Sequence, residues 1–184
     1  MIVQFHKDDE RRYSITIVTD DGQHRRMGAA PGYDPFLPHD LQHFIVEREL
    51  GLEKAIFGQI AAGGTAGVFT REEGATPGRA RSRQRRALRK KSDALRKAGQ
   101  DESQISERAT MVCMYHWMHS SSNPKLRRRA DEIEQWVTST MAMMDTEEKK
   151  RYTPAVQDRI SKSMASLSSK WQKVGIGQHL EVSW

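Results

Sequence analysis

The chain has 184 residues, the length of a single domain, with 36% hydrophobic and 29% charged residues and a net charge of +6. Its one cysteine, Cys113, excludes an internal disulfide framework. The longest weakly polar run, residues 55–69, is too short to span a bilayer, and the first residues show no signal-peptide pattern. We therefore expect a cytoplasmic protein with no membrane partner.

The first thirty residues predict three β-strands, over 2–5, 13–19 and 23–29. The second strand alternates apolar and polar residues with the period of two that is typical of a half-buried strand. An Asp-Asp-Gly turn separates it from the third strand, whose arginines indicate the edge of a sheet. The face expected to be buried carries Tyr13, Ile15 and Ile17.

Helix signals follow a proline-rich loop. Pro38 suits the start of a helix and Gly51 its end, while Asn123 and Thr153 each precede a proline and are suited to N-capping. A small-residue stretch over 52–64 is either a second helix or an irregular packed segment. The other helices are predicted over 38–50, 82–98, 101–119, 124–144 and 154–174.

The end of the chain predicts one more strand, over 178–184, which can rejoin the N-terminal sheet. Strands followed by helices indicate an α+β fold, a small antiparallel sheet with about five helices packed on one side. The expected organisation is one compact domain made of three parts. These are a module of strands and first helix over 1–70, a linker over 71–82, and a helical region with the terminal strand over 83–184.

The segment Pro38–Glu47, with sequence PHDLQHFIVE, carries the candidate site. On a helix, His43 and Glu47 fall about 40° and 80° from His39, so the three share one side, with Asp40 near its edge. Two histidines four residues apart can hold one divalent ion. Since apolar residues also border this side, we expect a later helix or a neighbouring subunit to cover it.

The pattern H-D-x-x-H over 39–43 resembles the H-E-x-x-H helix of the zincin metalloproteases. The resemblance implies zinc bound by His39 and His43, with Asp40 at the position of the general base, although Asp40 is one methylene shorter than the family's glutamate. We therefore predict a divalent metal such as zinc on His39, His43 and Glu47, with Asp40 as candidate catalytic residue for metal-assisted hydrolysis. The alternative is that the histidines only hydrogen-bond to a carboxylate or carbonyl and that Asp40 meets the helix dipole.

The same segment also resembles a group of short bacterial proteins of unknown function that share P-H-D-L-x-H-F-x-V-E. This resemblance covers about the first 70 residues of the chain. It implies a common N-terminal module and assigns no activity; separately, we expect a bacterial protein.

The segment Arg79–Lys97 holds ten cations and one acid, so the rest of the chain sums to a charge of −3. Such a helix can lie along the phosphates of a nucleic acid, and Leu88 and Leu95 give it a thin apolar stripe for docking on one neighbour. The alternatives are a solvated face that balances an acidic body in a self-associated form, or a partly disordered arm. The candidate nucleic-acid-binding residues are Arg79, Arg81, Arg83, Arg85, Arg86, Arg89, Lys90 and Lys91.

Overall fold

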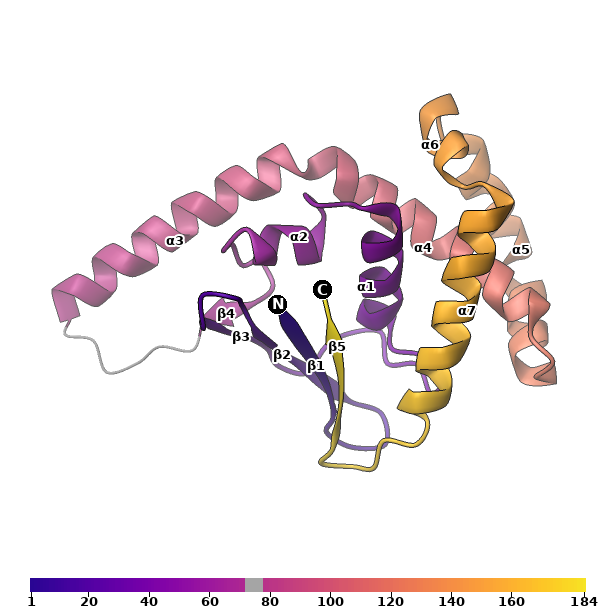
Figure 1. Cartoon of the computed structure of the whole chain (residues 1–184), viewed down its shortest axis with the longest axis horizontal. Helices are drawn as coiled ribbons and strands as arrows, with labels where there is room; N and C mark the ends of the chain where they lie inside the picture. The colour runs from indigo at the N-terminus through magenta and orange to yellow at the C-terminus, as the bar shows by residue number, and fades with distance from the viewer. Residues whose placement is uncertain (72–77) are drawn as a thin grey trace.

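The computed structural model describes residues 1–71 and 78–184 and has the predicted α+β fold (Figure 1). Five strands form one antiparallel sheet in the order β4-β3-β2-β1-β5. The predicted C-terminal strand rejoins the N-terminal one, since β5 pairs with β1 along its whole length. The strands are β1 Ile2–Lys7, β2 Tyr13–Val18, β3 His24–Met27, β4 Thr70–Arg71 and β5 His179–Ser183.

One face of the sheet is buried against helices, as the alternation in the second strand predicts. The register sets Val3 of β1 between Ile17 of β2 and Val182 of β5, and all three are buried. The opposite face carries polar side chains, such as Arg26 and Glu181, that are exposed. Figure 1 shows α1 and α2 above the sheet and α7 beside β5.

The described residues form seven helices, several with the predicted caps. The side chain of Asn123 accepts a hydrogen bond from the backbone N–H of Lys125 at 2.9 Å. Gly51 ends the first helix with φ 65°, a conformation that favours glycine. The helices are α1 His39–Leu50, α2 Ile56–Ala61, α3 Gly78–Ala98, α4 Gln100–Ser120, α5 Pro124–Met143, α6 Thr146–Arg151 and α7 Pro154–Trp171.

Three local predictions differ from the structure. The basic helix begins at Gly78, inside the predicted linker 71–82, because its Arg- and Ala-rich start is a good helix former. Residues 72–77 of that linker lie outside the described residues. Thr70–Arg71 pair with β3, so β3 is not an edge strand, and the short helix α6 was not predicted. Two- and six-residue elements are too short to show a periodicity in sequence.

The core lies between the sheet, α1 and the long C-terminal helices. Phe44 of α1 meets Phe5 of β1 and Phe57 of α2 edge to face, with ring centroids 6.4 and 5.2 Å apart. Trp171 of α7 is fully buried and packs edge to face on Tyr13 of β2. The contacts of Phe44 fix the rotation of α1, and therefore the direction in which its histidines point. None of the described helices is both long and apolar enough to cross a bilayer.

Candidate metal centre

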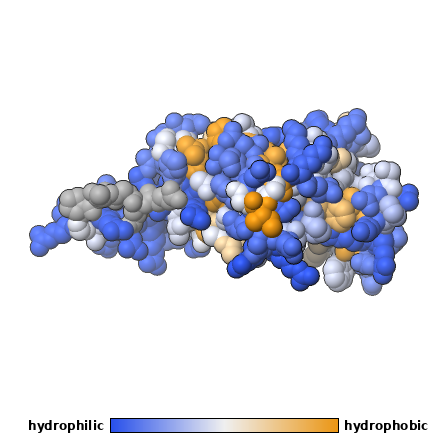
Figure 2. Space-filling view, turned by 90° about the horizontal axis from the view of Figure 1, so that it is seen from below, coloured by the Kyte–Doolittle hydropathy of each residue, from blue (hydrophilic) through white to orange (hydrophobic). Residues whose placement is uncertain are grey.

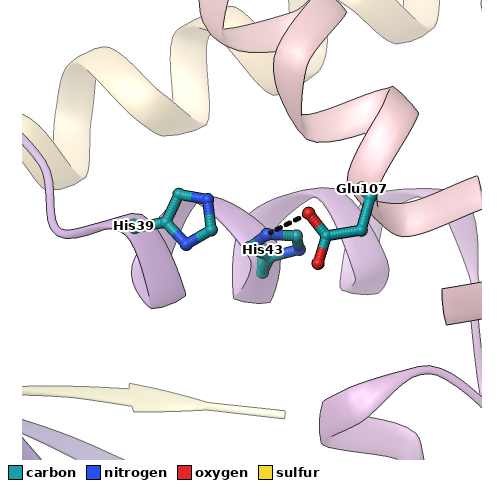
Figure 3. Close-up of side chains that lie close together, drawn as sticks. All are labelled: His39, His43 and Glu107. Atoms are coloured by element: carbon teal, nitrogen blue, oxygen red, sulfur yellow. Dashed lines mark ion pairs between the residues drawn. The ribbon is translucent and has the colours of Figure 1, made fainter. Parts of the chain in front are cut away.

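His39 and His43 of α1 and Glu107 of α4 form a cluster in which one potential ligand atom from each lies within 4.8 Å of the others (Figure 3). In a tetrahedral zinc site with bonds near 2.0–2.2 Å, ligand atoms lie about 3.3 Å apart. The cluster therefore has to contract by roughly 1.5 Å to hold zinc. His39 and Glu107 are exposed and able to change rotamer, whereas His43 is buried.

His43 is held by a chain of buried hydrogen bonds that reaches across to α4. The hydroxyl of Ser106 donates to Oε1 of Glu47 at 2.8 Å, and Nδ1 of His43 lies 2.9 Å from the same hydroxyl oxygen. When Glu47 is ionised, the one proton of that hydroxyl is engaged, so Nδ1 of His43, which also lies 3.3 Å from the hydroxyl of Thr110, carries the hydrogen and donates to Ser106. This tautomer leaves the lone pair of the imidazole on Nε2, which is the usual arrangement behind a metal-binding histidine.

Nε2 of His43 is buried and has no hydrogen-bond partner among the described residues. It lies 3.6 Å from Oε2 of Glu107, beyond hydrogen-bond distance (Figure 3). Burial, with a smaller effect from His39, lowers the pKa of His43 to about 3, so the ring is neutral near neutral pH, and with its one hydrogen on Nδ1 it leaves Nε2 unprotonated. A lone pair and a carboxylate facing each other at this separation favour a cation between them.

Glu47 is the last member of this series of hydrogen bonds and is itself fully buried. Its second oxygen, Oε2, accepts the backbone N–H of Phe57 at 2.9 Å, at the start of α2. Burial raises the pKa of Glu47 to about 7, against the lowering effect of the hydrogen bonds from Phe57 and Ser106. Glu47 therefore orients Ser106 and, through it, His43, and it does not belong to the three-residue cluster.

His39 is positioned by the proline-rich loop that precedes α1. Its backbone N–H donates to the carbonyl of Gly32 at 3.3 Å, and its ring lies edge to face on that of His43, with centroids 4.6 Å apart. Gly32 has φ 76°, and a Cβ added there would lie 2.8 Å from Cβ of His39. The glycine thus allows the loop to approach the histidine closely.

Asp40 points to the sheet and does not belong to the cluster. The hydroxyl of Tyr13 in β2 donates to its carboxylate, and the backbone N–H of Asp40 donates to the same hydroxyl at 3.4 Å. Burial is the main reason that the pKa of Asp40 is raised. This contact anchors the start of α1 on β2, and the catalytic role of Asp40 stays a prediction.

The cluster agrees in part with the predicted ligand set. The i, i+4 spacing brings His39 and His43 together, and a later helix, α4, covers their side of α1 as expected. Glu107, in place of Glu47, is the third member, because the rotation of α1 turns Glu47 inward against Ser106. A single sequence holds no signal that would select Glu107, 64 residues beyond His43, from the other acidic residues.

The predicted nucleic-acid-binding residues all lie on α3, apart from the cluster. All are exposed, and within α3 only Ser92 is buried. The predicted apolar stripe is present as well, since Leu88 and Leu95 are the two partly buried side chains of this helix.

No family model, curated protein or solved structure matches the chain. The resemblances to zincins and to short bacterial proteins therefore stay predictions, and the site has to be interpreted from its own geometry.

Proposed function

We propose that the protein binds one divalent transition metal ion, such as zinc, through His39, His43 and Glu107. The observation that carries this proposal is Nε2 of His43, a buried nitrogen without a hydrogen-bond partner among the described residues, 3.6 Å from Oε2 of Glu107. The chain from Glu47 through Ser106 supports it, because an orienting hydrogen bond on the far nitrogen is typical of metal-bound histidine. Two imidazoles and one carboxylate are ligands that zinc accepts.

Three protein ligands leave one position of a tetrahedral ion open, as in hydrolytic zinc sites, where the ion lowers the pKa of a bound water. Glu107 also lines a hollow of about 490 Å³ together with Arg96 and Lys97, at the end of α3. We propose metal-assisted hydrolysis of an anionic substrate as the reaction at this position. For Asp40 to act as its base, the carboxylate would have to leave the hydroxyl of Tyr13.

The test is metal content and uptake in protein purified without a histidine tag. After treatment with a chelator and dialysis, titration calorimetry with zinc is expected to give one site per chain. His39→Ala and Glu107→Gln are expected to weaken binding at least about ten-fold, and both replace exposed side chains. His119→Ala, an exposed histidine outside the cluster, is the matched control. The proposal is wrong if the wild type takes up no zinc, or if the cluster variants bind it as the control does.

A further inference from the structure

The helix α3 stands apart from the rest of the fold and has its own charge pattern. It extends to one end of the molecule, beyond the sheet (Figure 1). The rest of the protein contacts α3 along a single face of this helix. The hydroxyl of Ser92 accepts the backbone N–H of Thr65 at 3.2 Å, and Leu95 lies so near Gly64 that a Cβ added there would be 2.9 Å from its Cδ1. The remaining surface of α3 faces solvent.

The side of α3 opposite this docking face is a row of cations. At 100° per residue, its five members fall within about 50° of the direction opposite Leu88. Steps of four, three, four and seven residues separate them, and with a rise of 1.5 Å per residue they extend over about 27 Å. Within the described part of the chain, none of the five forms an ion pair. We call them the outer row: Arg79, Arg83, Arg86, Lys90 and Lys97.

A second set of cations borders a groove between α3 and β4. Arg71 of β4 and Arg89 and Arg96 of α3 line this groove, whose volume is about 650 Å³. Asp93, the one acid of α3, pairs with Arg96 at 3.2 Å and lies 3.9 Å from Arg89. Asp93 itself falls about 40° from the direction opposite Leu88, at the edge of the outer row, and its carboxylate turns toward Arg96 and Arg89 on the groove side. Hydrophilic side chains dominate the end of the molecule where α3 begins (Figure 2).

We infer that the outer row binds the phosphate backbone of duplex nucleic acid without reading its sequence. A stretch of about 27 Å of duplex axis presents roughly 16 phosphate charges, so a straight row of five cations finds partners along its whole length. Three of the five are arginines, which bind phosphate oxygens bidentately. Contacts to phosphates give position and affinity and no sequence preference, and because arginine and lysine can also read guanine in the major groove, the test compares two unrelated sequences.

Two features of α3 favour a duplex over other polyanions. The helix has no aromatic residue, and binding of single strands relies on stacking of bases on aromatic rings. Its two large apolar side chains, Leu88 and Leu95, already face the body, so no apolar face is left to enter a membrane surface. No member of the outer row belongs to the metal cluster and only Lys97 also lines the hollow beside Glu107, so we expect duplex binding to be independent of the metal.

The test compares two variants that lose the same charge. One carries Arg83→Gln, Arg86→Gln and Lys90→Gln in the outer row, and the control carries three exposed substitutions on α5, Lys125→Gln, Arg127→Gln and Arg128→Gln. Fluorescence anisotropy follows binding to 30-base-pair DNA and RNA duplexes of two unrelated sequences, from about 50 to 300 mM salt. All substituted residues are exposed and in helices, so circular dichroism is expected to show unchanged folding.

The wild type and the control are expected to bind both sequences alike, with a slope of log affinity against log salt of about −4.5, from five contacts at −0.9 each. The outer-row variant is expected to lose about three contacts, which lowers the slope to about −2 and the affinity at 100 mM salt at least ten-fold. A chelator is expected to change nothing.

Four results would overturn the inference. One is a wild type that binds neither duplex at about 50 mM salt, and another is equal losses in the two triple variants. The third is binding to polyglutamate, or to vesicles with one third phosphatidylserine, as tight as binding to the duplexes. The fourth is a loss of duplex binding on chelation, which would show that binding depends on the metal cluster and not on the outer row.

Discussion

Replacing Glu47 with glutamine removes a fully buried carboxyl group whose pKa burial raises from 4.5 to about 7. Below pH 4.5 the group is protonated in both the folded and the unfolded chain. Between pH 4.5 and 7 the folded chain keeps a proton that the unfolded chain has lost, so Glu47 favours folding at low pH and its contribution is lost as the pH rises through 7. The glutamine side chain of the variant does not titrate and lacks this dependence.

The magnitude follows from the shift in pKa. At 1.36 kcal/mol per unit, the rise from 4.5 to about 7 corresponds to roughly 3 kcal/mol, most of which falls between pH 5 and 8. His43 acts in the opposite sense, because its lowered pKa of about 3 stabilises the fold above pH 6.5 and the effect is lost as the pH falls. The wild type alone would therefore show a small net dependence, and the difference between wild type and Glu47→Gln isolates the carboxyl group.

Urea unfolding, followed by the fluorescence of the four tryptophans, measures this difference at pH 5, 6, 7 and 8 in the presence of a chelator. Relative to wild type, Glu47→Gln is expected to become more stable by roughly 2–3 kcal/mol from pH 5 to pH 8. Glu132→Gln, an exposed change on α5, is the control and is expected to show no such trend. A constant difference across the range, or a trend of opposite sign, would refute the proposed ionisation of Glu47.

Three further changes have expected outcomes. Glu107→Gln is expected to change the free energy of unfolding by less than about 0.5 kcal/mol in urea, because its side chain is 64% exposed, while calorimetry shows weaker zinc binding. Gly51→Ala is expected to destabilise the protein by about 1 kcal/mol in thermal melts, since the residue has φ 65°. Trp171→Ala, at a fully buried position, is expected to cost about 3–5 kcal/mol in urea unfolding.

The parts of the fold that local chemistry specifies were predictable from the sequence. Gly51 ends α1 where the sequence indicates, and the proline after Thr153 begins α7. The alternation of Tyr13, Ile15 and Ile17 correctly gives the buried face of β2. By contrast, β4 is held by its pairing with β3, and a two-residue strand has no pattern of its own.

The candidate site was predictable only where its residues share one helix. His39 and His43 meet because a single turn separates them. Glu107 and Ser106 come from α4, and their position opposite α1 depends on how two helices pack on a common core. That packing sets the rotation of α1, which turns Glu47 away from solvent and makes it an orienting residue in place of a ligand.

The positions of the protons in the buried hydrogen bonds between His43, Ser106 and Glu47 link the ionisation of Glu47 to metal binding. If the proton of His43 moved from Nδ1 to Nε2, Ser106 would donate to Nδ1 and leave Oε1 of Glu47 without its donor. A buried carboxylate in that state favours the protonated form. A metal on Nε2 requires the other arrangement, in which Nδ1 carries the hydrogen and Ser106 donates to Glu47, and an ionised Glu47 is the stronger acceptor for this hydrogen bond. Zinc binding and ionisation of Glu47 therefore favour each other, so zinc affinity is expected to rise as the pH passes through about 7. Because a glutamine side chain has no charge to gain, the Glu47→Gln variant is expected to show a weaker rise.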